Sequence, residues 1–291
     1  MKNILFILAL CFLGFAPPVS EYTFYQALSS SLVTAEIEVN TNSTHYHEPF
    51  KIKLKNISGR NLKIKLENGM KLEPGESEYQ NFMIVQEQLI SLAPNQREET
   101  KVRAMCLEAH DRAPSGGSDY HFSGRVNDKL KGLGRIIQAN ELYSYMGQDA
   151  VWAVADGKSA REISGYHYDE GLPLIRYVAN LNGEELPPKP AADDYQRNYR
   201  AAVTKATVGG AFTFNASFPM AVEIALFNED NTVVRELFNN KETPPGEHVV
   251  EYSFDHSVYT EDFYTVRMIA DGELFLENRF SFNPEDWRNG N

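Results

Sequence analysis

Phe50-Lys-Ile-Lys-Leu-Lys55 and Leu62-Lys-Ile-Lys-Leu66 alternate strictly between apolar residues and lysines. A period of two is typical of β-strands that bury one face. The turn-rich segment between them, Asn56-Ile-Ser-Gly-Arg-Asn61, predicts an antiparallel hairpin. The five lysines would then share the outward face, as a patch for acidic glycans or as a solvated surface that resists aggregation.

Further strand patterns surround this pair and extend it into a sandwich-like sheet region at residues 33–39, 82–87, 89–92 and 100–105. After a loop near residue 114 the apolar spacing becomes helical. Residues 126–137 predict one helix, and a second ends at Asp156-Gly157. Ser159 with Glu162 forms a capping box for a short third helix. Residues 21–169 are therefore predicted to form an α+β N-terminal domain, an antiparallel β-sandwich-like sheet followed by two or three helices.

The second half of the chain has a different residue pattern. Residues 170–203 are polar and contain Leu186-Pro-Pro-Lys-Pro190, which predicts a linker. Six short apolar or alternating runs follow, separated by turn sequences. They predict an all-β immunoglobulin-like C-terminal sandwich over residues 204–285, with a tail at 286–291.

Three segments of this half carry a resemblance. Val222-Glu-Ile-Ala-Leu-Phe-Asn228, Pro244-Pro-Gly-Glu-His248 and Phe263-Tyr-Thr-Val-Arg-Met268 are similar, in that order, to the flagellar hook-capping immunoglobulin-like domain and the C-terminal sorting domain of type IX secretion. The resemblance implies a spacer, dock or anchor. The end of the chain, residues 282–291, lacks the basic, apolar tail of a sorting domain.

The first residues predict export. Lys2 and an apolar run from Ile4 to Phe15 fit a signal peptide over residues 1–20. That run is shorter than the roughly 20 apolar residues that cross a bilayer, so we expect no transmembrane segment. The location expected is periplasmic, outer-surface or secreted. Because the leader contains Cys11, the mature chain would keep one cysteine, Cys106.

Composition narrows the possible partners. The formal net charge of −12 opposes non-specific binding to nucleic acid or anionic lipid. No phosphate-binding loop, zinc-type Cys/His array or calcium loop occurs, so no cofactor is predicted. His45 and His47 are candidate metal ligands, since alternate positions of a strand share a face, but no third ligand is evident.

A single cysteine in an exported chain cannot close an internal disulfide, so Cys106 is buried and inert, pairs with another molecule or performs chemistry. A thiolate held against a glutamine amide can expel ammonia and leave a thioester, provided that apolar walls exclude water. Gln148 lies on the second predicted helix, and Trp152 follows one turn later on the same face.

These residues carry a second resemblance. Gln148-Asp-Ala-Val-Trp152 resembles the Gln-x-Ala-Ile-Trp core of the bacterial thioester domains of surface adhesins, and Cys106 with Pro114 downstream resembles their cysteine segment. The resemblance implies that Cys106 gives the sulfur, Gln148 gives the acyl group and Trp152 shields the bond. Gly147 stands where that family has threonine. The implied activity is covalent attachment to a protein or glycan at a cell surface.

Two alternatives stay open. The protein could be a structural envelope component in which Cys106 is a small buried apolar residue. It could also be a Cys/His hydrolase that pairs Cys106 with His110, or with His121 or His167 as base. Of the three, the sequence favours an exported binding or adhesion protein over an enzyme.

Overall fold

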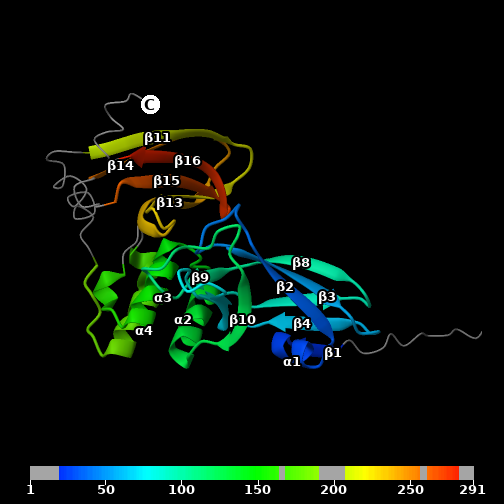
Figure 1. The fold of residues 1–291 in the computed structure, drawn as a ribbon. Coiled ribbons are helices and arrows are strands. Elements are labelled where there is room, and N and C mark those ends of the chain that lie inside the picture. Colours follow the sequence, from blue (N-terminus) through cyan, green and yellow to red (C-terminus); the bar gives the residue numbers. More distant parts are fainter. Residues whose placement is uncertain (1–19, 164–167, 190–206, 256–260, 282–291) are drawn as a thin grey trace, which may run out of the picture.

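The computed structural model describes residues 20–163, 168–189, 207–255 and 261–281. Most of the predicted leader and the tail at 286–291 lie outside the described residues. In the described part of the chain, no helix is long and apolar enough to cross a membrane. The fold is β-rich α+β with mostly antiparallel sheets, and Figure 1 shows its two parts, a mixed N-terminal domain and a C-terminal set of strands above it.

The N-terminal domain contains ten strands within the described residues. They are β1 (Ser20–Thr23), β2 (Val33–Val39), β3 (Phe50–Asn56), β4 (Leu62–Leu66), β5 (Met70–Pro74), β6 (Phe82–Ile84), β7 (Gln88–Leu92), β8 (Arg97–Val102), β9 (Ala104–Cys106) and β10 (Tyr120–Arg125). They form three sheets, with strand orders β1-β4-β7, β2-β3-β8 and β10-β5-β6-β9. The pairing of β1 with β4 is parallel, and the other pairings are antiparallel.

The hairpin predicted from residues 50–66 is wrong, although both of its strands are present. β3 pairs with β2 and β8, whereas β4 pairs with β1 and β7. The apolar faces of both strands belong to one core, so the strands pack face to face in different sheets. The side-chain amide of buried Asn56 donates to the carbonyls of Arg60, Leu92 and Ala93 and fixes the chain reversal between them.

The five lysines therefore do not share a face, because Lys51, Lys53 and Lys55 stand on one sheet and the other two on its neighbour. Acidic side chains also lie beside them. Lys53 pairs with Glu38, and the Lys65 ammonium is 2.9 Å from Glu87. The outer faces of this sandwich consequently carry mixed charge rather than a basic patch.

Four helices and one 3₁₀ turn accompany the sheets in the described residues. They are α1 (Phe24–Ser29), α2 (Asp128–Ala139), α3 (Tyr145–Asp156), η1 (Ala160–Glu162) and α4 (Tyr168–Asn182). The predicted end of α3 is confirmed, with Gly157 at a φ of 69°, where a glycine is favoured. The capping box of Ser159 and Glu162 is also present. α4 occupies the start of the predicted linker and buries Leu174 in the first domain, so helical structure continues past residue 169.

The C-terminal part contains six described strands, separated by the predicted turns. They are β11 (Thr207–Ala216), β12 (Met220–Phe227), β13 (Val233–Thr243), β14 (Gly246–Asp255), β15 (Phe263–Ala270) and β16 (Glu273–Ser281). β11 pairs with β14, and the other four form a sheet in the order β13-β12-β15-β16. Apolar residues from both sheets form a second core.

Strand β12 belongs to both cores. Val222, Ile224 and Leu226 lie in the C-terminal core. Ala225 and Phe227, which point to the opposite side of the strand, lie in the N-terminal core. Burial on both faces explains why this strand is a nearly continuous apolar run. The C-terminal strands thus share a buried boundary with the first domain, on its helical side (Figure 1).

Candidate functional site

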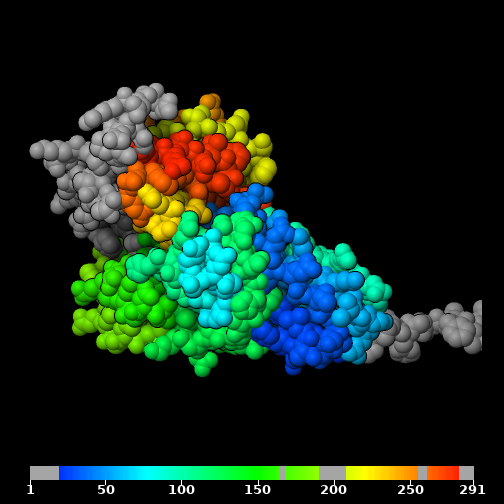
Figure 2. Space-filling model, in the orientation of Figure 1, coloured from blue at the N-terminus to red at the C-terminus, as the bar shows by residue number. Residues whose placement is uncertain are grey.

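The loop between β2 and β3 reaches from the first domain onto the C-terminal strands. The Ser43 hydroxyl donates to the Gly272 carbonyl at 2.7 Å, and the N–H of Leu274 donates to the Asn42 carbonyl at 3.0 Å. Figure 2 shows dark blue atoms of this N-terminal region against the yellow-to-red C-terminal surface. The junction between the two parts is therefore anchored by this loop.

Cys106 ends strand β9 and meets helix α3 directly. The Gln148 side chain accepts the N–H of Cys106 through Oε1 and donates from Nε2 to the Cys106 carbonyl, both at 2.9 Å. Both residues are fully buried. The two residues that the sequence motif named are thus in contact, with the glutamine amide joined to the cysteine main chain by two hydrogen bonds.

The sulfur itself faces His45. Sγ of Cys106 lies 2.9 Å from Nδ1 of His45 and 3.6 Å from the His45 carbonyl oxygen. On the other side of the ring, Nε2 accepts the main-chain N–H of Val233 at 2.9 Å. One imidazole therefore joins the sulfur in the first domain to strand β13 in the C-terminal part.

Trp152 closes the site on the helix side. It follows Gln148 by one turn of α3, and its ring stacks on that of His45 at 6.0 Å between centroids and 20° between planes. Trp152 is 5% exposed, so the residue is buried beside His45. Its buried N–H has no hydrogen-bond partner among the described residues. An unpaired buried donor is uncommon and is often found at functional sites.

Burial fixes the charge state of the pair. It lowers the pKa of His45 to about 3, aided by the electrostatic effect of neighbouring Arg267 and His47. Burial also raises the pKa of the Cys106 thiol, aided by the negative charge of Glu108. At neutral pH the site accordingly holds a neutral imidazole beside a protonated thiol.

Gly147 has a local explanation. A Cβ at this position would lie 2.2 Å from the Leu142 carbonyl oxygen and 2.9 Å from Cε of Met105. Backbone cannot yield as a flexible side chain does, so no larger residue fits without moving α3. The close approach of α3 to the preceding turn therefore explains why a glycine stands at position 147.

The other predicted histidines do not join Cys106. His110 is exposed, and His121 is largely exposed with Glu73 3.9 Å from its Nε2. His167 lies outside the described residues. In the described segments no group of three His, Cys, Asp or Glu side chains could hold a metal ion.

The predicted shared face of His45 and His47 required a strand, but residues 41–48 form turns. The two rings therefore point to different neighbours, and His47 contacts Glu223. Its Nε2 lies 3.1 Å from Oε2 of Glu223, while the Tyr46 hydroxyl donates to Oε1 of the same carboxyl at 2.6 Å. Burial and the neighbouring Glu223 raise the pKa of Tyr46 well above its ordinary value, so the phenol remains a donor. His45 and His47 therefore face different partners rather than one shared site.

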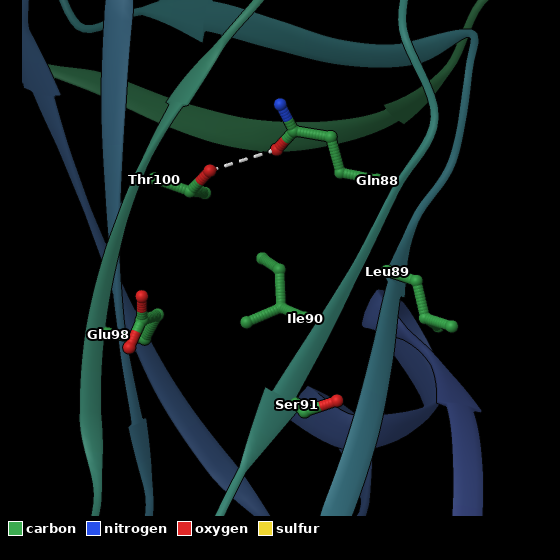
Figure 3. Close-up of a pocket in the computed structure, with 6 residues that line it drawn as sticks. All are labelled: Gln88, Leu89, Ile90, Ser91, Glu98 and Thr100. Carbon is green, nitrogen blue, oxygen red and sulfur yellow. Dashed lines mark hydrogen bonds between the residues drawn. The ribbon is translucent and has the colours of Figure 1, made fainter.

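A cavity of about 390 Å³ at the domain junction reaches the edge of this cluster. Its lining includes His45 and Tyr79 from the first domain and Asp230 and Arg267 from the C-terminal strands. A second hollow, of about 490 Å³, lies between strands β7 and β8. Figure 3 shows Gln88 and Thr100 bonded across it, and Glu98 is the one charged residue of its lining. Of these two cavities, the one at the junction is therefore the one lined by several ionisable side chains, including His45.

Comparisons with known proteins give little further guidance. No family model matches the chain, and no curated protein matches it. Among solved structures, the chain is similar to red sea bream transglutaminase with a TM-score of 0.18 and 9% sequence identity. That match covers 86% of this chain and 31% of the transglutaminase, so the chain spans about a third of that protein. A similarity this low carries no argument about fold or activity.

Proposed function

We propose that this chain is an exported binding protein that attaches covalently to its target through a thioester between Cys106 and Gln148. The observation that carries the proposal is the pairing of the Gln148 amide with the main chain of Cys106 at 2.9 Å in a fully buried site. The amide pairs with the main chain of the residue that carries the sulfur, so in this proposal the side chains of Cys106 and Gln148 rotate toward each other before the thioester forms.

The chemistry balances without a cofactor. The sulfur attacks the amide carbon of Gln148, the C–S bond forms and the C–N bond breaks. The thiol proton leaves with the amide nitrogen as ammonia. A target amine then attacks the thioester carbon, forms an amide and returns the sulfur as a thiol. Apolar walls protect the acyl group from water between these two steps.

The junction cavity supplies the approach in this proposal, because it is the described hollow that reaches His45 beside the sulfur. A target protein or glycan at a cell surface would present its amine there. The C-terminal strands would form an immunoglobulin-like sandwich that holds or anchors the reactive domain. Export follows from the leader pattern at residues 1–20.

A second candidate is a structural envelope protein with an inert cysteine. It is favoured by the raised pKa of the Cys106 thiol and by the hydrogen bonds that both polar atoms of the Gln148 amide make with the main chain. A Cys/His hydrolase is less favoured, because the base beside the sulfur would need a free lone pair. Val233 already occupies the lone pair of Nε2, which leaves the proton on the nitrogen that faces the sulfur.

Intact mass of the purified mature protein tests the proposal. We expect a mass short by one ammonia, and a methylamine adduct at Gln148 after incubation with that amine. Cys106→Ala and Gln148→Glu are matched controls, since the first lacks the sulfur and the second lacks an amide to expel. A full mass with one titratable thiol would reject the thioester and favour the structural alternative.

A further inference from the structure

We infer that His45 is a catalytic residue for acyl transfer at Cys106, and that the main-chain N–H of Val233 keeps the proton of its ring on Nδ1. The inference rests on the proposed thioester. It adds a donor from the first domain and a positioning residue, Val233, from the C-terminal strands.

The proton position follows from the partner of Nε2. A main-chain N–H can only donate, so the Nε2 atom 2.9 Å from the Val233 nitrogen must present its lone pair. A neutral imidazole has one N–H, which is then on Nδ1. Since Nδ1 is 2.9 Å from Sγ of Cys106, this N–H donates to the sulfur.

A donor at this place acts on the charge that develops during acyl transfer. When an amine attacks the thioester, the C–S bond breaks and the electron pair stays on the sulfur. A thiolate in a dry interior is poorly stabilised, and a preorganised N–H directed at it lowers that cost. The proton lost by the attacking amine finally converts the thiolate to a thiol.

The ring cannot easily turn away from the sulfur. Trp152 stacks on one side, while Tyr46 and Phe227 meet the ring edge to face at 5.0 and 6.2 Å between centroids. Phe227 comes from strand β12, so the second domain supplies a wall as well as the N–H of Val233. The site is complete only with both domains in place.

Substitutions of His45 test its contact with the Cys106 sulfur and its contact with the Val233 N–H one at a time. Asparagine places an amide N–H near the position of Nδ1, whereas glutamine extends its amide toward the position of Nε2. We expect His45→Asn to keep the rate of methylamine transfer within a few-fold of wild type. We expect His45→Gln and His45→Ala to slow it by roughly 10- to 100-fold, the effect of losing one hydrogen bond to a charged group.

The role of Val233 is tested in the full chain by Val233→Pro, which removes the N–H. Val233→Ala is its matched control, because it trims the side chain and keeps the donor. Nitrogen-15 shifts of His45 should report an Nδ1–H ring in wild type and Val233→Ala, and a changed proton position in Val233→Pro. Methylamine transfer should slow in Val233→Pro alone.

Two results would overturn the inference. One is an Nε2–H ring in the wild-type protein. The other is equal transfer rates in His45→Asn and His45→Gln, or in Val233→Pro and Val233→Ala. A wild-type chain of full mass would reject the thioester and with it the catalytic role. The nitrogen shifts would still decide the proton position, so the two failures are distinguishable.

Discussion

His45 and His47 stand two residues apart in one loop, and both meet the C-terminal strands, yet their surroundings differ in kind. His45 lies between a sulfur and a main-chain N–H, with aromatic rings around it. His47 shares the carboxyl group of Glu223 with the Tyr46 hydroxyl. We call the first the sulfur half and the second the acidic half of the junction. The difference teaches that the partner across the domain boundary, and not the residue type, decides what each histidine can do.

The largest expected effect comes from breaking the acidic half. In Glu223→Ala the buried Tyr46 hydroxyl and His47 ring lose their acceptor. Two unsatisfied buried groups predict a loss of about 3–5 kcal/mol in the free energy of unfolding. Urea unfolding followed by tryptophan fluorescence measures it.

Glu273→Ala is the matched control, because Glu273 also crosses the junction but forms an exposed ion pair with Lys101. Exposed pairs contribute about 0–1 kcal/mol. Equal losses in the two variants would mean that the acidic half does not hold the domains together.

The next effect comes from moving α3 in the sulfur half. Gly147→Ala would drive a methyl group against the Leu142 carbonyl oxygen, so we expect a loss of about 1–3 kcal/mol and displacement of Gln148 from Cys106. Gly59→Ala is the control, since no atom lies within 4 Å of the added Cβ. The midpoint temperature of thermal unfolding and the yield of the methylamine adduct should both be lower in Gly147→Ala and unchanged in Gly59→Ala. Unchanged stability would contradict the close approach of α3.

The smallest expected effect is on the pH dependence of stability, which distinguishes the buried His45 ring from a freely titrating one. Below pH 6.5 the unfolded chain protonates His45, whereas the folded ring stays neutral down to its pKa of about 3. Stability from this group is therefore complete above pH 6.5 and is lost, at about 1.4 kcal/mol per pH unit, as the pH falls toward 3. Between pH 7 and pH 5, wild type should lose about 2 kcal/mol more than His45→Asn. The same pH dependence in both proteins would show that His45 protonates freely in the fold.

The sequence predicted where the strands lie better than it predicted which strands pair with each other. Alternation in residues 50–55 and 62–66 identifies one buried face in each strand. The apolar face of each of the two strands is indeed buried. It does not identify which strand edge pairs with which, and that choice rests on Asn56 and on the competing strands β2, β7 and β8. The turn residues between the two strands reverse the chain equally well into a hairpin or into a second sheet.

For the site, the sequence motif brought Cys106 and Gln148 into consideration together, but the sequence offered His45 only as a candidate metal ligand beside His47 and did not connect it with Cys106. The contact of His45 with Cys106 joins residues 61 apart in sequence, and no local pattern encodes it. Val233 acts through its main chain, which leaves no trace in residue type. Glu223 did leave a signal, as the one charged residue within the apolar strand Met220–Phe227. A charge at a position buried on both faces indicates a partner on another element.

Strand β12, with one face in each core, also has an evolutionary consequence. A chain whose modules were independent could exchange its C-terminal domain for another without retuning the first. Here the loop at residues 41–48 and the segment from Glu223 to Val233 must change together, since each completes the interior of the other. We therefore expect these two stretches to be inherited as a unit, and recombination between them to give chains that fold poorly.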